Sequence, residues 1–188
     1  MLIKAIEFAF KKHQGQTRKG SKIPYITHPL AVMGYVMAED APENVAIAAL
    51  LHDVLEDTEG SYQGSYNEIV EYFGEEVARL VQNVAEPEGL KKSKDQKGTW
   101  KERKKHTIDH LNKADTYTKM IVCADKLHNA ICIREDLAVG IDAWSKFNAP
   151  KEDVAWYYNS ILDSLKELEG TRIYKLLKIE VRTLFEDV

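Results

Sequence analysis

The chain has 188 residues, 44% apolar and 30% charged, with a net charge of −4 at neutral pH. This length suits one domain with a sizeable core, and the composition excludes a disordered or fibrous protein. The negative charge argues against general nucleic-acid binding, which needs a broad basic surface to displace counterions from phosphates. No apolar run approaches the roughly eighteen residues that a membrane span needs. We therefore expect a single domain over residues 1–188 that binds neither nucleic acid nor membrane.

Apolar residues recur at helical spacing along the chain, and the alternation typical of strands is scarce, so the pattern predicts an all-α fold. A capping box, Ser65 to Glu68, predicts the start of a helix that Gly74 ends, and a second box, Thr99 to Glu102, predicts another start. In chain order, the predicted helices span 2–13, 28–38, 43–56, 66–73, 75–87, 100–111, 116–136, 151–169 and 173–185.

The first thirteen residues and the cysteines both indicate the compartment. MLIKAIEFAFKKH reads as a short amphipathic helix, because charged residues interrupt its apolar region and no small-residue cleavage site follows. Cys123 and Cys132 stand on separate turns of one predicted helix and cannot bridge within it, so we expect two reduced thiols. We therefore expect a cytoplasmic protein.

Two loops are basic and contain glycine. Residues 14–27, QGQTRKGSKIPYIT, include Arg18 and Lys19 and lead directly into His28. Residues 87–98 contain four lysines between positions 91 and 97, and a solvated charge run is the expected reading of that loop. The first loop is the stronger candidate for binding a small anion.

The stretch LLHDVLEDT, residues 50–58, places four ionisable side chains at the end of an apolar helix. On a continuous helix His52, Asp53, Glu56 and Asp57 would share roughly one face. The apolar residues around them leave little other solvent-facing perimeter, and charged groups seldom go inside a protein unless they are paired or hold a metal. The face is therefore predicted to line a cleft or a polar core site.

His52 and Asp53 offer an imidazole and a carboxylate to one divalent cation, but two ligands hold a metal loosely. Two further residues offer similar chemistry: His28, which follows the basic loop, and Asp125, a carboxylate in the apolar segment MIVCADKLHNAI. Such a mixed donor set suits manganese, iron or zinc.

The order His28, His52-Asp53, Asp125 resembles the HD phosphohydrolase superfamily. The segments GQTRKGSKIPYITHP, ALLHDVLEDT, WKERK and ADKLHN resemble the hydrolase domain of the RelA/SpoT alarmone enzymes, particularly the free-standing small alarmone hydrolases. The resemblance extends from about residue 3 to about residue 170.

The resemblance implies a compact helical HD-domain fold of about eight to ten helices. It also implies one manganese ion and removal of the 3′-pyrophosphate from guanosine tetra- or pentaphosphate, the alarmone of the stringent response, giving GDP or GTP and pyrophosphate. No synthetase segment is expected. The implied residues are His28, His52, Asp53 and Asp125 as metal ligands, Glu56 and Asp57 as the catalytic acidic pair, and Arg18, Lys19, Asn129 and Tyr157 toward the nucleotide.

Two alternatives stay open on the sequence. Beside the alarmone hydrolase, the first alternative is an HD phosphohydrolase for another nucleotide, such as a deoxynucleotide or NADPH. The second is a metal-binding module that senses the nucleotide without cleaving it. Glu56 and Asp57 favour a hydrolase, since a sensor does not need a second acidic pair. The oligomeric state is not indicated.

Overall fold

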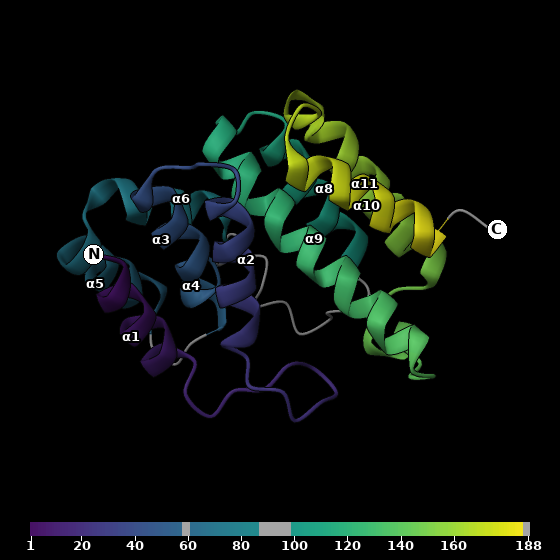
Figure 1. Cartoon of the computed structure of the whole chain (residues 1–188), viewed down its shortest axis with the longest axis horizontal. Helices are drawn as coiled ribbons and strands as arrows, with labels where there is room; N and C mark the ends of the chain where they lie inside the picture. Colours follow the sequence, from purple (N-terminus) through teal and green to yellow (C-terminus); the bar gives the residue numbers. More distant parts are fainter. Residues whose placement is uncertain (58–60, 87–98, 186–188) are drawn as a thin grey trace. The chain divides into compact units, whose positions relative to one another are not determined.

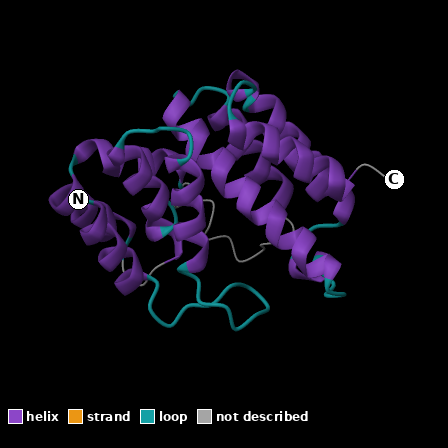
Figure 2. Ribbon diagram, in the orientation of Figure 1, coloured by secondary structure: helices purple, strands orange, loops and turns teal. Residues whose placement is uncertain are grey.

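The computed structural model describes residues 1–57, 61–86 and 99–185 (Figure 1). These residues form helices joined by loops, with no strand among them, as Figure 2 shows. An isolated bridge between Thr17 and Pro24 is the β-type pairing found in the described part. The predicted all-α fold is confirmed. The helices divide into two compact units, residues 1–88 and 89–188.

The first unit is arranged around α3. Its helices are α1 (Leu2–Lys12), α2 (Thr27–Met37), α3 (Glu43–Leu51), α4 (Val54–Asp57), α5 (Tyr62–Phe73) and α6 (Glu75–Val84). Helix α3 packs against α1, α2 and α6, and every residue from Val45 to Leu51 is buried. A helix that is apolar on all sides is stable only when other elements surround it, so ENVAIAALL becomes the core of this unit.

The second unit is built along the long helix α9. Its elements are α8 (Trp100–Leu111), α9 (Thr116–Ala138), the 3-10 turn η1 (Trp144–Lys146), α10 (Lys151–Ser164), the 3-10 turn η2 (Lys166–Leu168) and α11 (Arg172–Phe185). Helix α9 packs along α11, and α10 contacts both α8 and α11. The side chain of Asp115 caps α9 by accepting a hydrogen bond from the backbone N–H of Thr118 at 2.8 Å.

The prediction of one continuous helix over residues 43–56 is wrong. Helix α3 ends at Leu51, His52 and Asp53 form a turn, and the short α4 follows. The imidazole Nδ1 of His52 lies 2.8 Å from the carbonyl oxygen of Ala49, an oxygen placed to accept the N–H of Asp53 in an uninterrupted helix. A side chain that bonds a nearby carbonyl competes with the helical ladder at that point.

Two predicted helix boundaries also differ. The capping residue of α5 is Ser61, whose hydroxyl accepts from the N–H of Gly64 at 3.0 Å, whereas Ser65 is buried inside the helix. Helix α10 ends at Ser164 rather than at residue 169, because the chain tightens into the 3-10 turn η2. Helix α8 begins after Thr99 as predicted, but that threonine makes no capping hydrogen bond.

Other sequence expectations fare differently. Neither Cys123 nor Cys132 forms a disulfide in the described structure, as predicted. Within the described ranges, no helix combines the length and apolar character required to cross a bilayer. The lysines at positions 91–97 lie outside the described residues. The single domain over residues 1–188 stays a prediction.

Candidate metal centre

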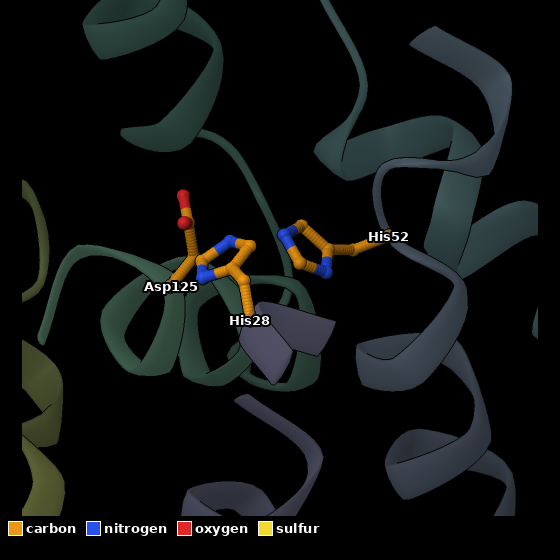
Figure 3. Close-up of side chains that lie close together, drawn as sticks. All are labelled: His28, His52 and Asp125. Carbon is orange, nitrogen blue, oxygen red and sulfur yellow. The ribbon is translucent and has the colours of Figure 1, made fainter. Parts of the chain in front are cut away.

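Two imidazoles and a carboxylate converge inside the first unit. His28 lies in the first turn of α2, and His52 and Asp53 occupy the turn between α3 and α4. The two histidine rings meet edge-on, with centroids 5.1 Å apart (Figure 3). The Oδ2 atom of Asp53 lies 3.6 Å from Nε2 of His28 and 3.1 Å from Nε2 of His52. Both histidines are almost fully buried, so three potential metal donors meet where water has little access.

The contact between His52 and Ala49 also settles which ring nitrogen of His52 carries the hydrogen. A carbonyl oxygen can only accept a hydrogen bond, so the Nδ1 atom that lies 2.8 Å from it carries the hydrogen. In a neutral imidazole, Nε2 then carries the lone pair. Metal-binding histidines are usually oriented in this way, through a hydrogen bond from the other ring nitrogen.

Tyr25 is a residue of this cluster that the sequence reasoning missed. Its hydroxyl donates a hydrogen bond of 2.6 Å to Oδ2 of Asp53, the same oxygen that faces the two histidines. Its ring lies 6.0 Å from that of His28. Tyr25 stands in the predicted basic loop, three residues before His28, where an isolated tyrosine gives no local signal of a polar contact.

Glu56, one of the two predicted catalytic carboxylates, is fixed by the backbone. Its Oε1 atom accepts a hydrogen bond of 2.7 Å from the N–H of Glu86, just beyond the end of α6. The side chain is half-buried. Asp57 is the last residue of α4, and its side chain lies outside the described part of the structure. The break after α3 means that these two residues share α4, while the candidate ligands precede it.

The loop that contains Arg18 and Lys19 is held in a defined shape. The N–H of Arg18 donates to the carbonyl of Ile23 at 2.9 Å, next to the bridge between Thr17 and Pro24. The guanidinium of Arg18 lies 5.6 Å from the centroid of the Tyr25 ring, a cation–π contact. Arg18 is half-buried and Lys19 is exposed. The structure thus connects Arg18, through Tyr25, to Asp53.

In the second unit, the predicted ligand Asp125 is buried in the middle of α9 (labelled in Figure 3). Both of its oxygens have a partner on the same helix: Asn129 donates to Oδ1 at 2.6 Å, and the ammonium of Lys126 donates to Oδ2 at 2.7 Å. Burial is the largest single influence on the pKa of Lys126 and acts to lower it, but the adjacent Asp125 carboxylate, Tyr157 and Tyr158 together more than offset burial and hold that pKa well above its usual value. Asn129, predicted to face the nucleotide, therefore also orients a predicted metal ligand.

Tyr157 lies in α10 and belongs to an aromatic and basic cluster of the second unit. Its ring packs edge-on against Trp100, with centroids 6.0 Å apart. The ammonium groups of Lys104 and Lys126 lie 5.2 and 5.8 Å from the ring centroid. Its hydroxyl is buried and has no hydrogen-bond partner among the described residues. Such a hydroxyl offers a hydrogen bond that the described residues do not use.

Known proteins match this chain over the segments that contain the candidate site residues. A family model described as HD domain matches residues 5–142, which include His28, His52, Asp53 and Asp125. A guanosine-3′,5′-bis(diphosphate) 3′-pyrophosphohydrolase of Xenopus tropicalis is 32% identical over 174 residues, covering 91% of this chain and 86% of that protein.

Two solved structures are similar to this one. The structure of a metazoan ortholog of SpoT that hydrolyzes ppGpp has a TM-score of 0.73 and 28% identity, and the match covers 96% of this chain and 93% of that one. A protein of Listeria monocytogenes has a TM-score of 0.72 and 30% identity, with 87% of this chain and 97% of the other covered. The similarity therefore extends over nearly the whole length of each protein.

Proposed function

The chain belongs to the HD domain family, and we propose that it is a metal-dependent hydrolase of the alarmone guanosine tetraphosphate and of the corresponding pentaphosphate. The products are GDP or GTP and the intact 3′-pyrophosphate. The observation that carries the proposal is the buried convergence of His28, His52 and Asp53, in a chain similar along its length to a guanosine-3′,5′-bis(diphosphate) 3′-pyrophosphohydrolase.

The donor set fits one divalent ion. His28, His52 and Asp125 are buried and each offers one ligand atom, and the Asp53 carboxylate faces both imidazoles. We propose these four residues as the ligands and manganese as the ion, since two imidazoles with two carboxylates suit manganese among other transition metals. When bound, the ion supplies a Lewis acid that acidifies water and polarises a phosphoryl oxygen.

The protein's own part in the reaction begins with Glu56. Its carboxylate is oriented by the hydrogen bond from the N–H of Glu86, and as the proposed general base it accepts a proton from the attacking water. Asp57, the next residue, is the proposed second member of the acidic pair. General-base catalysis needs a carboxylate in a fixed direction, and a backbone donor provides that orientation more rigidly than a mobile side chain.

The substrate carries several phosphate charges, and the basic loop is the proposed place for them. Arg18 is held over Tyr25, and the exposed Lys19 is next to it. A chain of net charge −4 needs such a local basic loop to attract a polyanion. We further propose that Asn129 and Tyr157 contact the nucleoside, Tyr157 through the hydroxyl that has no partner in the described residues.

The family model crosses the boundary between the two compact units, which supports one HD domain rather than two independent ones. We propose that this domain acts in the cytoplasm, in agreement with its two unbridged cysteines.

The test is a substrate panel with the purified, manganese-loaded protein. Guanosine tetraphosphate, a deoxynucleoside triphosphate and NADPH are supplied separately, and kcat/KM is measured for each. The proposal predicts the highest kcat/KM for guanosine tetraphosphate. A higher value for either other nucleotide would assign the enzyme to that substrate, and tight binding of guanosine tetraphosphate without turnover would make the protein a sensor.

A further inference from the structure

The side chain of Tyr25 contacts both Asp53 and Arg18, two residues of the candidate site in the first unit. Its hydroxyl donates to Oδ2 of Asp53 at 2.6 Å, and its ring lies 5.6 Å beneath the guanidinium of Arg18. Asp53 is a proposed metal ligand, and Arg18 is a proposed phosphate-binding residue. The carboxylate and the guanidinium have opposite charges and different proposed roles, yet both are contacted by the same tyrosine side chain.

The loop fixes Tyr25 from two further directions. The N–H of Tyr25 donates to the carbonyl of Gln16 at 2.9 Å, and the side chain of Gln16 hydrogen-bonds Nδ1 of His13 at 2.8 Å. The buried ring of His13 packs against the ring of Tyr25, with centroids 5.0 Å apart. A side chain held by backbone, packing and hydrogen bond loses little entropy when it orients its neighbours.

We propose that Tyr25 is a positioning residue with two separable roles: its hydroxyl orients Asp53 toward the metal, and its ring holds Arg18 toward the nucleotide. The role toward the metal depends only on Asp53 being a ligand, whereas the role toward the nucleotide rests on the proposed function. A neutral donor suits the first role, because it aims the carboxylate without cancelling the charge that attracts the cation. An uncharged π-face suits the second, because it directs a guanidinium without neutralising the charge that attracts phosphate.

The two roles predict different effects. Removing an outer partner of a metal ligand lowers metal affinity by about 10- to 100-fold. Removing an exposed-side cation–π contact changes substrate affinity by about two- to fivefold. Tyr25→Phe deletes the hydroxyl and keeps the ring, so it should affect the metal alone. Tyr25→Leu deletes both and should affect the metal and the nucleotide.

The experiment compares Tyr25→Phe and Tyr25→Leu with Tyr72→Phe, which removes the hydroxyl of an exposed tyrosine on α5. Manganese affinity is measured by calorimetric titration of each metal-free protein, and KM for guanosine tetraphosphate is measured at saturating manganese. We expect Tyr25→Phe to weaken manganese binding at least tenfold with KM unchanged. Tyr25→Leu should add a two- to fivefold rise in KM, and Tyr72→Phe should match the parent in both measurements.

Two results would overturn the inference. Manganese affinity of Tyr25→Phe within twofold of the parent would remove the role of the hydroxyl. Equal KM values for the Phe and Leu variants would remove the role of the ring. Thermal unfolding of each variant verifies that it is folded, and Tyr25→Phe keeps the test valid if the Leu variant is not. A parent that fails to cleave the alarmone would refute the proposed function, and the manganese titration would still decide the role of Tyr25.

Discussion

Replacement of Glu56 by glutamine separates the catalytic role of this side chain from its role in folding and binding. The carboxylate accepts a hydrogen bond from the N–H of Glu86 at 2.7 Å. The amide oxygen of glutamine has the same position and can accept the same hydrogen bond, but the side chain can no longer take a proton from water. Glu56→Gln should therefore fold, bind manganese and bind substrate while it loses turnover.

Both magnitudes follow from this contact. Loss of a general base lowers kcat by about 10²-fold or more, which corresponds to at least about 2.7 kcal/mol of transition-state stabilisation. Changing a charge-assisted hydrogen bond into a neutral one costs about 1 kcal/mol of folding stability. For a chain of 188 residues, that cost lowers Tm by about 2–4 °C.

The assay measures three quantities on one preparation: kcat with guanosine tetraphosphate, manganese content by elemental analysis, and Tm by calorimetry. The reasoning predicts a fall in kcat of at least about 100-fold, full manganese content and a small fall in Tm. Loss of manganese would show that Glu56 is a ligand. Turnover within a fewfold of the parent would show that the carboxylate has no catalytic role.

Three further predictions address the metal, the basic loop and the second unit. Asp53→Ala should remove both manganese and activity, and retention of stoichiometric manganese by elemental analysis would refute the ligand assignment. Arg18→Ala should raise KM several-fold with kcat little changed, and an unchanged KM would place the phosphates elsewhere. A hydrogen bond from the buried Lys119 is the main cause of the lowered pKa of Glu167. The ionised carboxylate therefore stabilises the fold at pH values above the pKa that Glu167 has in the unfolded chain. This stabilisation is lost as pH falls through the lower pKa of the folded state. Glu167→Gln should therefore lower Tm near pH 7, and the difference from the parent should shrink as pH falls below the pKa that Glu167 has in the unfolded chain; a difference that widened in acid would contradict this sign.

The helices were predictable because their apolar spacing is regular, and most predicted helices were found. The break in the helix at His52 was not predictable, because nothing in the local pattern AIAALLHDVLED shows that the imidazole will hydrogen-bond the carbonyl of Ala49. Similarly, Ser61 and Ser65 both precede suitable helix residues, and the choice between two such caps depends on tertiary packing. Only the fold decides which local interaction forms.

The site shows the same division. Residue type and order predicted His28, His52 and Asp53 as candidate ligands, since a buried imidazole or carboxylate in an apolar segment needs an explanation, and the structure brings these three side chains together. Tyr25 was missed because its importance lies in a contact with a residue 28 positions away. A tyrosine in a loop is common, and its hydroxyl becomes informative only when its acceptor is known.

Analysis of the reaction products tests the central claim most directly. Manganese-loaded protein is incubated with guanosine tetraphosphate, and the products are identified by phosphorus NMR. The account predicts GDP and pyrophosphate in equal amounts, with no reaction after the metal is chelated and recovery when manganese is restored. Release of orthophosphate in place of pyrophosphate, or full activity in the chelated protein, would contradict it.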